Sequence, residues 1–167
     1  MNPISNRREA LGIKAFSWFH RIVYNLTAGR LLGVVAGAPV LLLTTTGHRT
    51  GKQRTKPLLY LMEDDAYVVV ASYAGRPSNP AWYRNLQSHP AALIQVNNRR
   101  LRVKAETVSV EARADLWTKL TAMYPGYAHY QARTRREIPI MILRPSDRTL
   151  QARKWPWSLL FENITSE

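Results

Sequence analysis

Residues 44–57 combine a glycine turn with hydroxyls and cations, the densest concentration of chemical groups in this sequence. Gly47 and Gly51 permit a tight turn that leaves backbone N–H groups unpaired, and Lys or Arg stands at positions 49, 52, 54 and 56. Such a concavity favours phosphate or carboxylate. The alternative is a solvated basic hairpin that binds nothing. A nucleotide-binding P-loop is excluded, because the glycines are one residue too close and an extended segment follows Lys52.

A second cluster, residues 79–86, begins a short helix at Pro80. A proline at a helix start leaves N–H groups that point outward, and these favour anions. The aromatic pair Trp82 and Tyr83 either packs in the core or flanks a planar ring.

A third cluster, residues 123–131, brings Tyr124, Tyr127 and Tyr130 together at intervals of three. The break at Pro125 separates the first tyrosine from the other two. Either the tyrosines are interfacial aromatics with hydroxyls in water, or they clamp a flat substrate and supply a proton.

Composition excludes several kinds of chemistry. The chain has no cysteine, so thiolate nucleophiles, redox dithiols and cysteine-ligated metals are excluded. Its four histidines lack ligand spacing, and no metal site is predicted. No nucleophile elbow is present, and no carboxylate lies between Asp65 and Glu106 to support paired-carboxylate catalysis. An enzyme of this sequence therefore depends on an organic cofactor.

A formal charge of +13 predicts an anionic partner: nucleic acid, an acidic lipid surface or a small polyanion. The basic residues are spread evenly and no recognition motif is present, which argues against a nucleic-acid-binding barrel. No segment has the length of a spanning helix or the pattern of a signal peptide, which predicts a cytoplasmic protein. Association with the inner face of the cell membrane stays open.

Hydrophobic periodicity divides the 167 residues into three regions. Residues 1–38 carry an amphipathic helix over about 9–27 that either docks on its own domain or lies on an anionic membrane. Residues 39–145 form the main domain. Residues 146–167 include a basic-aromatic stretch that either anchors at a membrane interface or docks on the barrel or a second subunit. Both a monomer and a homodimer are compatible with this pattern.

Short extended runs dominate the main domain. Strands are expected at residues 40–46, 58–62, 67–72, 93–96, 101–108 and 138–143, and helices at 81–88, between Ser109 and Pro125, and at 127–133. The connections between the first three strands are too short for parallel crossovers. About six antiparallel strands usually close on themselves, because closure removes exposed edges. The sequence therefore predicts a mainly β, α+β fold, a small antiparallel β-barrel decorated by helices.

In their order and separation, the three clusters resemble the deazaflavin-dependent nitroreductase and quinone reductase family of the FMN-binding split-barrel type. The resemblance covers about residues 40–145 and rests on residues 43–51, 79–86 and 123–131. It implies a split β-barrel that binds reduced coenzyme F420 rather than FMN. This coenzyme is a 5-deazaflavin with a phosphodiester and an oligoglutamate tail, and the polyanionic tail agrees with the basic turn.

The resemblance implies hydride transfer from this cofactor to an electron-poor acceptor, a quinone or a nitroaromatic. The residues implied to bind the cofactor are His48, Arg49, Thr50, Arg54, Thr55, Lys56, Pro57, Leu58, Leu59, Val70, Ala71, Ser72, Tyr73, Ala81, Trp82, Tyr83, Arg84 and Asn85. Those implied to face the substrate, and to hydrogen-bond the oxygen that gains charge, are Tyr124, Tyr127, Tyr130 and Ser72.

The chain departs from the family at two of these positions. His48 stands where the family usually has arginine, and Tyr73 stands where a basic or small residue is common. The alternative function is a non-catalytic split barrel that binds a flavin, a tetrapyrrole or a lipid.

Overall fold

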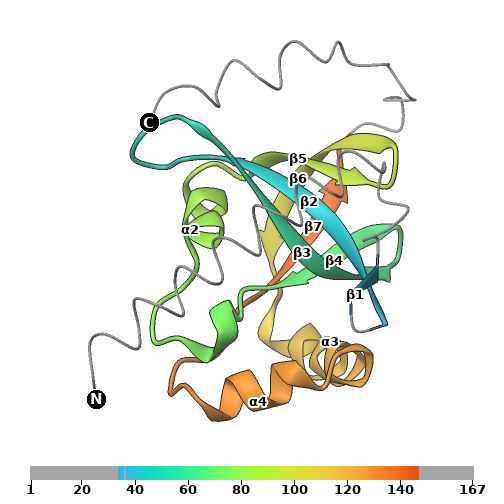
Figure 1. The fold of residues 1–167 in the computed structure, drawn as a ribbon. Coiled ribbons are helices and arrows are strands. Elements are labelled where there is room, and N and C mark those ends of the chain that lie inside the picture. Colours follow the sequence, from blue (N-terminus) through green and yellow to red (C-terminus); the bar gives the residue numbers. More distant parts are fainter. Residues whose placement is uncertain (1–33, 36, 147–167) are drawn as a thin grey trace.

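The computed structural model describes residues 34–35 and 37–146, whose strands form one antiparallel sheet that closes on itself (Figure 1). The strands are β1 (Val34–Val35), β2 (Ala38–Thr46), β3 (Gln53–Glu63), β4 (Ala66–Val70), β5 (Ala91–Val96), β6 (Arg99–Thr107) and β7 (Ile140–Pro145). Their order is β1-β2-β3-β4-β7-β6-β5, and β2 also pairs with β5. Strands β2 to β7 therefore form a closed barrel, which confirms the predicted small antiparallel barrel.

Alternation along β6 shows why this sequence forms the barrel wall. Leu101, Val103 and Ala105 are buried, whereas Arg102 and Lys104 between them are exposed. A period of two is the side-chain period of a strand with one wet face, so the apolar set fixes the register toward the core.

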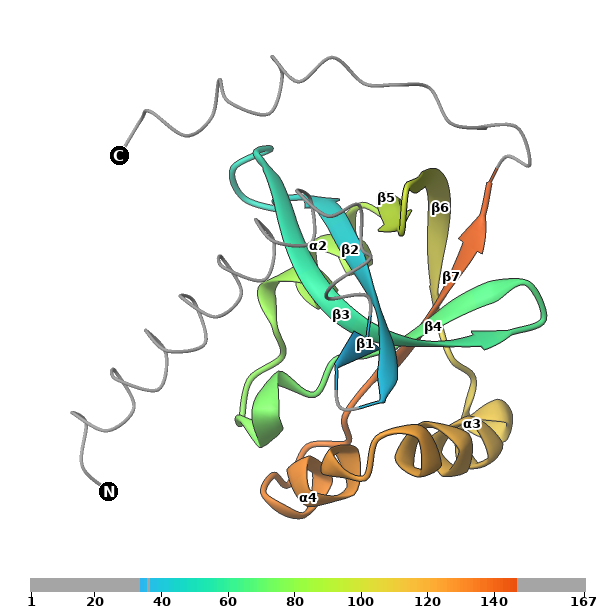
Figure 2. The ribbon, with the colours of Figure 1, turned by 45° about the vertical axis from the view of Figure 1, so that its right-hand side comes forward.

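Within residues 37–146 four helical segments accompany the barrel: η1 (Tyr73–Gly75), α2 (Ala81–Ser88), α3 (Val110–Met123) and α4 (Gly126–Ala132). In two views α3 and α4 lie together at one end of the barrel, while α2 lies beside the β2–β3 hairpin (Figures 1 and 2). The predicted cap of α3 is confirmed, because the Ser109 hydroxyl accepts the Ala112 N–H at 3.4 Å. Helix α2 has the predicted bounds.

Two large hydrophobic clusters and a small one, of Val40 and Leu42, fill the described part of the fold. The first lies inside the barrel and under α2, and includes Leu41, Leu43, Ile94 and Leu143. The second packs the outer face of β4 and β7 against α3 and α4, with Leu120 as a fully buried member. The barrel thus has apolar side chains on both faces where helices cover it.

Several predicted boundaries are wrong, and β2, β5 and β6 each begin two residues earlier than expected. Strand β3 begins at Gln53 rather than at residue 58, because its ladder with β2 continues to the pair Thr46 and Gln53 although the residues there are polar. Strand β4 ends at Val70 rather than at Ser72, since the chain turns into η1. Strand β7 begins at Ile140, two residues later than expected.

The predicted amphipathic helix over residues 9–27 and the basic-aromatic stretch over 153–161 lie outside the described residues. Among the residues that are described, no helix is long and apolar enough to cross a membrane.

Candidate functional site

The glycine turn closes the β2–β3 hairpin with hydrogen bonds of its own. The Gly47 N–H donates to the Lys52 carbonyl at 2.9 Å, and the Gly51 N–H donates to the Gly47 carbonyl at 2.8 Å. Gly51 has a φ of +67°, which favours glycine, and a Cβ on Gly47 would lie 2.7 Å from the Thr50 hydroxyl. Both glycines are therefore needed for this turn.

Asn85 joins the hairpin to α2. Its side chain is 3% exposed, and its Oδ1 accepts the His48 backbone N–H at 3.1 Å and lies 2.9 Å from His48 Nδ1. Its Nδ2 donates to the Thr45 hydroxyl at 3.0 Å. An amide oxygen only accepts, so this geometry places a proton on His48 Nδ1. The first and second sequence clusters, nearly forty residues apart, thus meet through one buried amide.

The hairpin has two faces, and only one of them is turned toward α2. Arg54 lies directly opposite Thr45, whose hydroxyl is bonded to α2, and Lys56 lies two residues further along the same face. Thr55 is on the other face, where its hydroxyl is 2.8 Å from that of Thr44. The structure therefore groups Arg54 and Lys56 with His48 and separates Thr55 from them.

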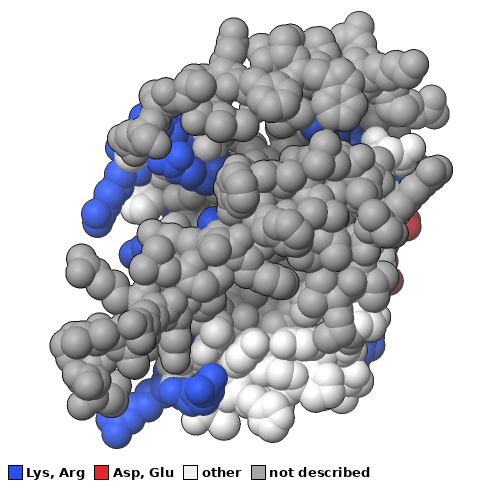
Figure 3. All heavy atoms as spheres, in the orientation of Figure 1, with Lys and Arg blue, Asp and Glu red and all other residues white. Residues whose placement is uncertain are grey.

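The hairpin is cationic and contains no carboxylate from Ala38 to Met62. Arg49, Lys52 and Arg54 are exposed and make no ion pair with any Asp or Glu in the described part of the chain. Lys and Arg atoms gather on this side of the surface (Figure 3), where Figure 1 has the hairpin tip. Unneutralised cations attract a polyanion. The expectation of unpaired N–H groups in the turn is wrong, because those of Gly47, His48, Thr50, Gly51 and Lys52 are bonded within the protein.

The three tyrosines of the third cluster form one packed group. The hydroxyls of Tyr124 and Tyr130 are 3.3 Å apart, and the rings of Tyr124 and Tyr127 meet edge to face at 5.1 Å between centroids. A Cβ on Gly126 would overlap the Tyr124 ring, so glycine at this position permits the packing. The predicted grouping of the tyrosines is therefore seen in the structure.

The loop after β4 brings η1 against α4. Tyr73 and Ala74 have φ of 48° and 54°, a left-handed conformation that non-glycine residues rarely adopt. Gly75 has φ of +74°, and a Cβ there would lie 2.7 Å from the Tyr130 carbonyl oxygen. This close approach holds the loop that carries Ser72 beside the helix that carries Tyr130.

Arg136 fixes the backbone of this loop, and the sequence contains no signal for that role. Its guanidinium donates to the carbonyls of Ala71 at 3.1 Å, Ser72 at 2.8 Å and Arg76 at 2.9 Å, and to Asn79 Oδ1 at 2.8 Å. Its partners lie 57 to 65 residues away in the sequence. A planar fork with five donors can make such a set, which lysine cannot.

The predicted cofactor residues fall into sets by exposure and face. Exposed or half-exposed at the hairpin tip and on α2 are His48, Arg49, Thr50, Arg54, Lys56, Ala81 and Arg84. On the outer face of β3, at the end of β4 and on η1 lie Thr55, Pro57, Leu59, Val70, Ser72 and Tyr73. In the inner cluster or buried beside it are Leu58, Ala71, Trp82, Tyr83 and Asn85. Of the two alternatives for Trp82 and Tyr83, the structure has core packing.

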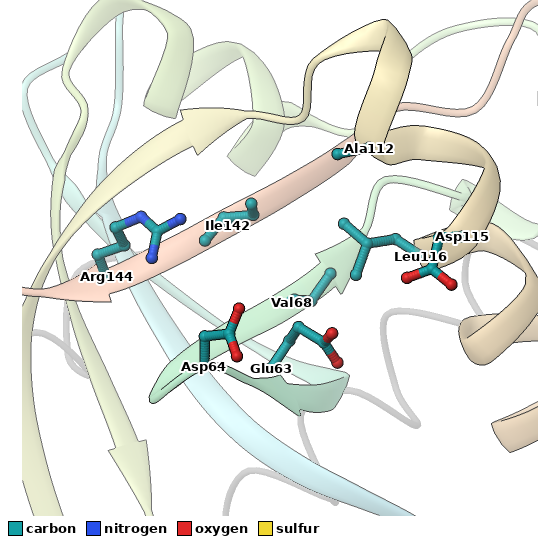
Figure 4. Close-up of a pocket in the computed structure, with 8 residues that line it drawn as sticks. All are labelled: Glu63, Asp64, Val68, Ala112, Asp115, Leu116, Ile142 and Arg144. Carbon is teal, nitrogen blue, oxygen red and sulfur yellow. The ribbon is translucent and has the colours of Figure 1, made fainter.

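A pocket that the sequence did not predict lies between the β3–β4 turn, β7 and α3 (Figure 4). Val68, Leu116 and Ile142 give it apolar walls, and Glu63, Asp64, Ala112, Asp115 and Arg144 complete its lining. Its volume is about 210 Å³, below the range of about 300–1,000 Å³ typical of small-molecule sites. Its acidic lining is also unsuited to a polyanion.

Burial and contact with Tyr124 raise the pKa of two phenols of the tyrosine group, those of Tyr127 and Tyr130. The hydrogen bond with Tyr124, followed by burial, raises the pKa of Tyr130 to about 12. Burial, with Tyr124 and Tyr130 adding to it, raises the pKa of Tyr127 as well. Both groups are therefore neutral hydrogen-bond donors near pH 7.

We expect the Tyr124→Phe variant to lower the pKa of Tyr130 toward its ordinary value of about 10, because the hydrogen bond is the largest cause of the shift. Between pH values of about 10 and about 12, Tyr130 stays protonated in the native protein, whereas it ionises in the unfolded chain. Its stabilising effect is thus complete below pH 10 and is lost as pH rises toward about 12. Titration of carbon-labelled tyrosine by NMR checks this, with Tyr67→Phe as control. An unchanged Tyr130 titration in Tyr124→Phe would contradict it.

Comparison with known proteins gives a consistent result. The sequence model described as "F420H(2)-dependent quinone reductase" matches residues 18–145. An F420H(2)-dependent quinone reductase of Mycobacterium tuberculosis (strain H37Rv) is 40% identical over 128 residues, which is 74% of this chain and 86% of the relative.

Two solved structures are also similar. One is an F420-H2 dependent reductase, with 37% identity and a TM-score of 0.59 over 64% of this chain and 94% of the other. The second is described as a domain-swapped dimer, with 31% identity and a TM-score of 0.61 over 86% of this chain and all of the other. With the family model covering most of the chain, the protein belongs to the F420H(2)-dependent quinone reductase family.

Proposed function

We propose that this chain is an enzyme that transfers a hydride from reduced coenzyme F420 to a quinone. The observation that carries the proposal is the carboxylate-free cationic hairpin that Asn85 holds against α2. The chain's family and its relative of the same name support the same activity, and they do not favour the non-catalytic alternative.

The donor set of the hairpin fits the cofactor's phosphodiester and oligoglutamate tail. Arg49 and Arg54 are exposed cations, and Thr50 adds a hydroxyl. These residues and Lys56 would hold the tail, and Ser72 and Tyr73 would lie near the ring. When bound, reduced F420 supplies two electrons and one hydrogen as a hydride.

The protein's own contribution is to orient the reactants and to stabilise the charge that develops. A quinone that receives this hydride would carry negative charge on an oxygen, which donors of the chain would stabilise. Tyr127 and Tyr130 are protonated and can hydrogen-bond an oxygen that gains charge. With their pKa raised they are donors of hydrogen bonds, and water supplies the final proton.

Turnover tests the proposal directly. Mixing the protein with reduced F420 and menadione is expected to oxidise the cofactor. The absorbance of the cofactor measures the rate of this reaction. Ligand binding without turnover would contradict the proposal and favour a non-catalytic binder. A nitroaromatic in place of menadione tests the second acceptor class.

We expect the double variant Arg54→Ala/Lys56→Ala to bind F420 about 10- to 100-fold more weakly, because two charge-assisted contacts to the tail are lost. The loss should be larger at low salt, where such attraction is least screened. Fluorescence titration of F420 at two salt concentrations measures it.

The matched control removes two exposed cations from another strand, Arg99→Ala/Arg102→Ala on β6. The control should retain the wild-type affinity to within about twofold. An equal loss in both double variants would indicate only a general charge effect and would contradict the assigned hairpin.

We also propose that the protein is cytoplasmic and meets its quinone at an anionic membrane surface. The charge of +13 supports this, as does the basic-aromatic stretch over residues 153–161. Co-sedimentation with vesicles rich in phosphatidylglycerol, against neutral vesicles, tests it.

A further inference from the structure

Carboxylates and cations are separated along the barrel. The seven carboxylates of the described residues gather around α3. Each is on α3, pairs with a side chain of α3, lines the pocket beside it, or adjoins or pairs with such a residue: Glu63, Asp64, Asp65, Glu106, Glu111, Asp115 and Glu137. Figure 2 shows β5 and the start of β6 at the end of the barrel away from α3 and α4. That end therefore has no carboxylate among the described residues.

The outer face of β6 carries cations at this end. Arg100, Arg102 and Lys104 alternate with buried apolar residues. Neither Arg102 nor Lys104 makes an ion pair with a carboxylate of the described chain. Lys104 also lies directly opposite Arg144 on β7, whose own partner is Glu106 at 3.4 Å. Like charges in direct opposition lower the stability of a sheet, so this face favours an anion from outside the sheet.

An exposed leucine lies beside these cations. Leu93 on β5 is 43% exposed, one of four exposed large apolar side chains among the described residues. It lies directly opposite Arg102 on one side and Thr44 on the other, and Thr44 lies opposite Thr55 on β3. Neighbouring strands are about 4.8 Å apart, so this row of outward residues is about 14 Å long. The row joins the cationic face of β6 to the strand that carries proposed cofactor residues.

The C-terminal segment leaves the barrel at the same face. The Ser146 N–H donates to the Arg102 carbonyl at 2.9 Å, so the last described residue lies beside the cations of β6. The basic-aromatic stretch begins at Arg153, seven residues further along the chain. An extended chain covers at most about 3.5 Å per residue, so this stretch starts within about 25 Å of the cationic face.

We infer that the outer face of β5 and β6, with Leu93, Arg100, Arg102 and Lys104, docks on an anionic lipid bilayer. The inference rests on the proposed meeting of the protein with a membrane and assigns it a surface. Lipid phosphates would accept hydrogen bonds from the cations, and Leu93 would enter the boundary between head groups and acyl chains. The carboxylates around α3 would be repelled, which orients the barrel on the bilayer. Nucleic acid offers phosphates but no apolar layer for the leucine, so lipid is the favoured partner.

The test is co-sedimentation of the Arg102→Glu/Lys104→Glu variant with vesicles of mixed phosphatidylglycerol and phosphatidylcholine. We expect its partition coefficient to fall at least about 30-fold relative to wild type, because two cations near the lipid surface are lost. The matched control is Arg133→Glu/Arg135→Glu, which makes the same change in charge with two exposed arginines at the end of α4 and just after it. At physiological salt the control should stay within about threefold of wild type.

A second variant removes the apolar part of the contact. We expect Leu93→Ser to weaken vesicle binding about 3- to 10-fold, and to do so equally at low and high salt, because the lost contact is not electrostatic. Wild-type vesicle binding in either β5–β6 variant, or an equal loss in the control, would overturn the inference. Tighter binding of the wild type to duplex DNA than to the vesicles at physiological salt would also overturn it.

Turnover separates this surface from the proposed activity. With reduced F420 and menadione, which needs no vesicle, the Arg102→Glu/Lys104→Glu variant should match the wild type. With a menaquinone carried in the vesicles, its rate should fall together with its binding. A lowered rate with menadione would indicate a general defect and would overturn the inference. If the wild type oxidises no reduced F420 with menadione, the proposed function fails, while the sedimentation comparison still decides the docking surface.

Discussion

The Arg136→Met variant is expected to lose about 3 kcal/mol in the free energy of unfolding, together with most of its quinone reductase activity. The wild-type guanidinium bonds three backbone carbonyls and Asn79 Oδ1. Methionine keeps an unbranched apolar side chain like the aliphatic part of arginine but leaves those acceptors without a donor. The loop that carries Ser72 then loses its attachment to the segment between α4 and β7, so that Ser72, proposed to face the acceptor, is no longer held in position.

Urea denaturation measures the stability loss, and steady-state kinetics measures the activity. Arg135→Met is a matched control, since Arg135 is the adjacent residue, is exposed and has the same charge. We expect its free energy of unfolding to stay within about 0.5 kcal/mol of wild type. Equal effects of the two substitutions would show that the hydrogen bonds of Arg136 have no special weight.

The Asn85→Leu variant is expected to lose about 2–3 kcal/mol of stability and to bind F420 at least about 10-fold more weakly. Leucine fills a similar volume, but the His48 backbone N–H, the imidazole and the Thr45 hydroxyl all lose their partner. The hairpin then tilts freely relative to α2, so its cations no longer converge on one ligand.

The loss of F420 affinity distinguishes a role of Asn85 in shaping the anion site from a purely structural role. Gln87→Leu on the same helix removes one hydrogen bond, which the side-chain amide donates to the Tyr83 hydroxyl at 3.2 Å. This variant is expected to leave F420 binding unchanged. Wild-type F420 affinity in Asn85→Leu, despite lowered stability, would refute the idea that docking on α2 shapes the anion site.

Local rules were sufficient for much of the barrel. The alternation along β6, the Ser109 cap of α3 and the proline that begins α2 all depend on residues within a few positions of each other. The lower limit on parallel crossovers then determined the antiparallel arrangement. These features needed no knowledge of distant contacts.

The errors arise where tertiary contacts override local pattern. The polar residues at the start of β3 pair with β2 because the glycine turn fixes the ladder, although no hydrophobic pattern marks them as a strand. Tyr73 and Ala74 adopt positive φ because the loop is fixed by distant groups, a conformation that composition does not indicate. Arg136 was missed for the same reason, since a lone arginine gives no sign of acceptors some sixty residues away.

Candidate site residues were predictable as three clusters, but not their arrangement. Resemblance gave the roles, while spacing alone could not say that Asn85 would bond His48 or that Thr55 would lie on the far face. Both follow from the register of one hairpin against one helix. These roles remain predictions until the variants above are measured.

Strand β2 is hydrogen-bonded along both edges, since Leu42, Leu43 and Thr44 each have a partner on β3 and another on β5. No local fraying can release these amides, so their deuterium uptake should proceed only through global unfolding and report the full unfolding free energy. Beyond Thr46 the ladder ends in the turn, whose hydrogen bonds are local and can open without global unfolding, so amides there should exchange faster than those of Leu42–Thr44 in the free protein. If the cofactor slows deuterium exchange at the turn but not in Leu42–Thr44, the slowed amides would locate the bound anion.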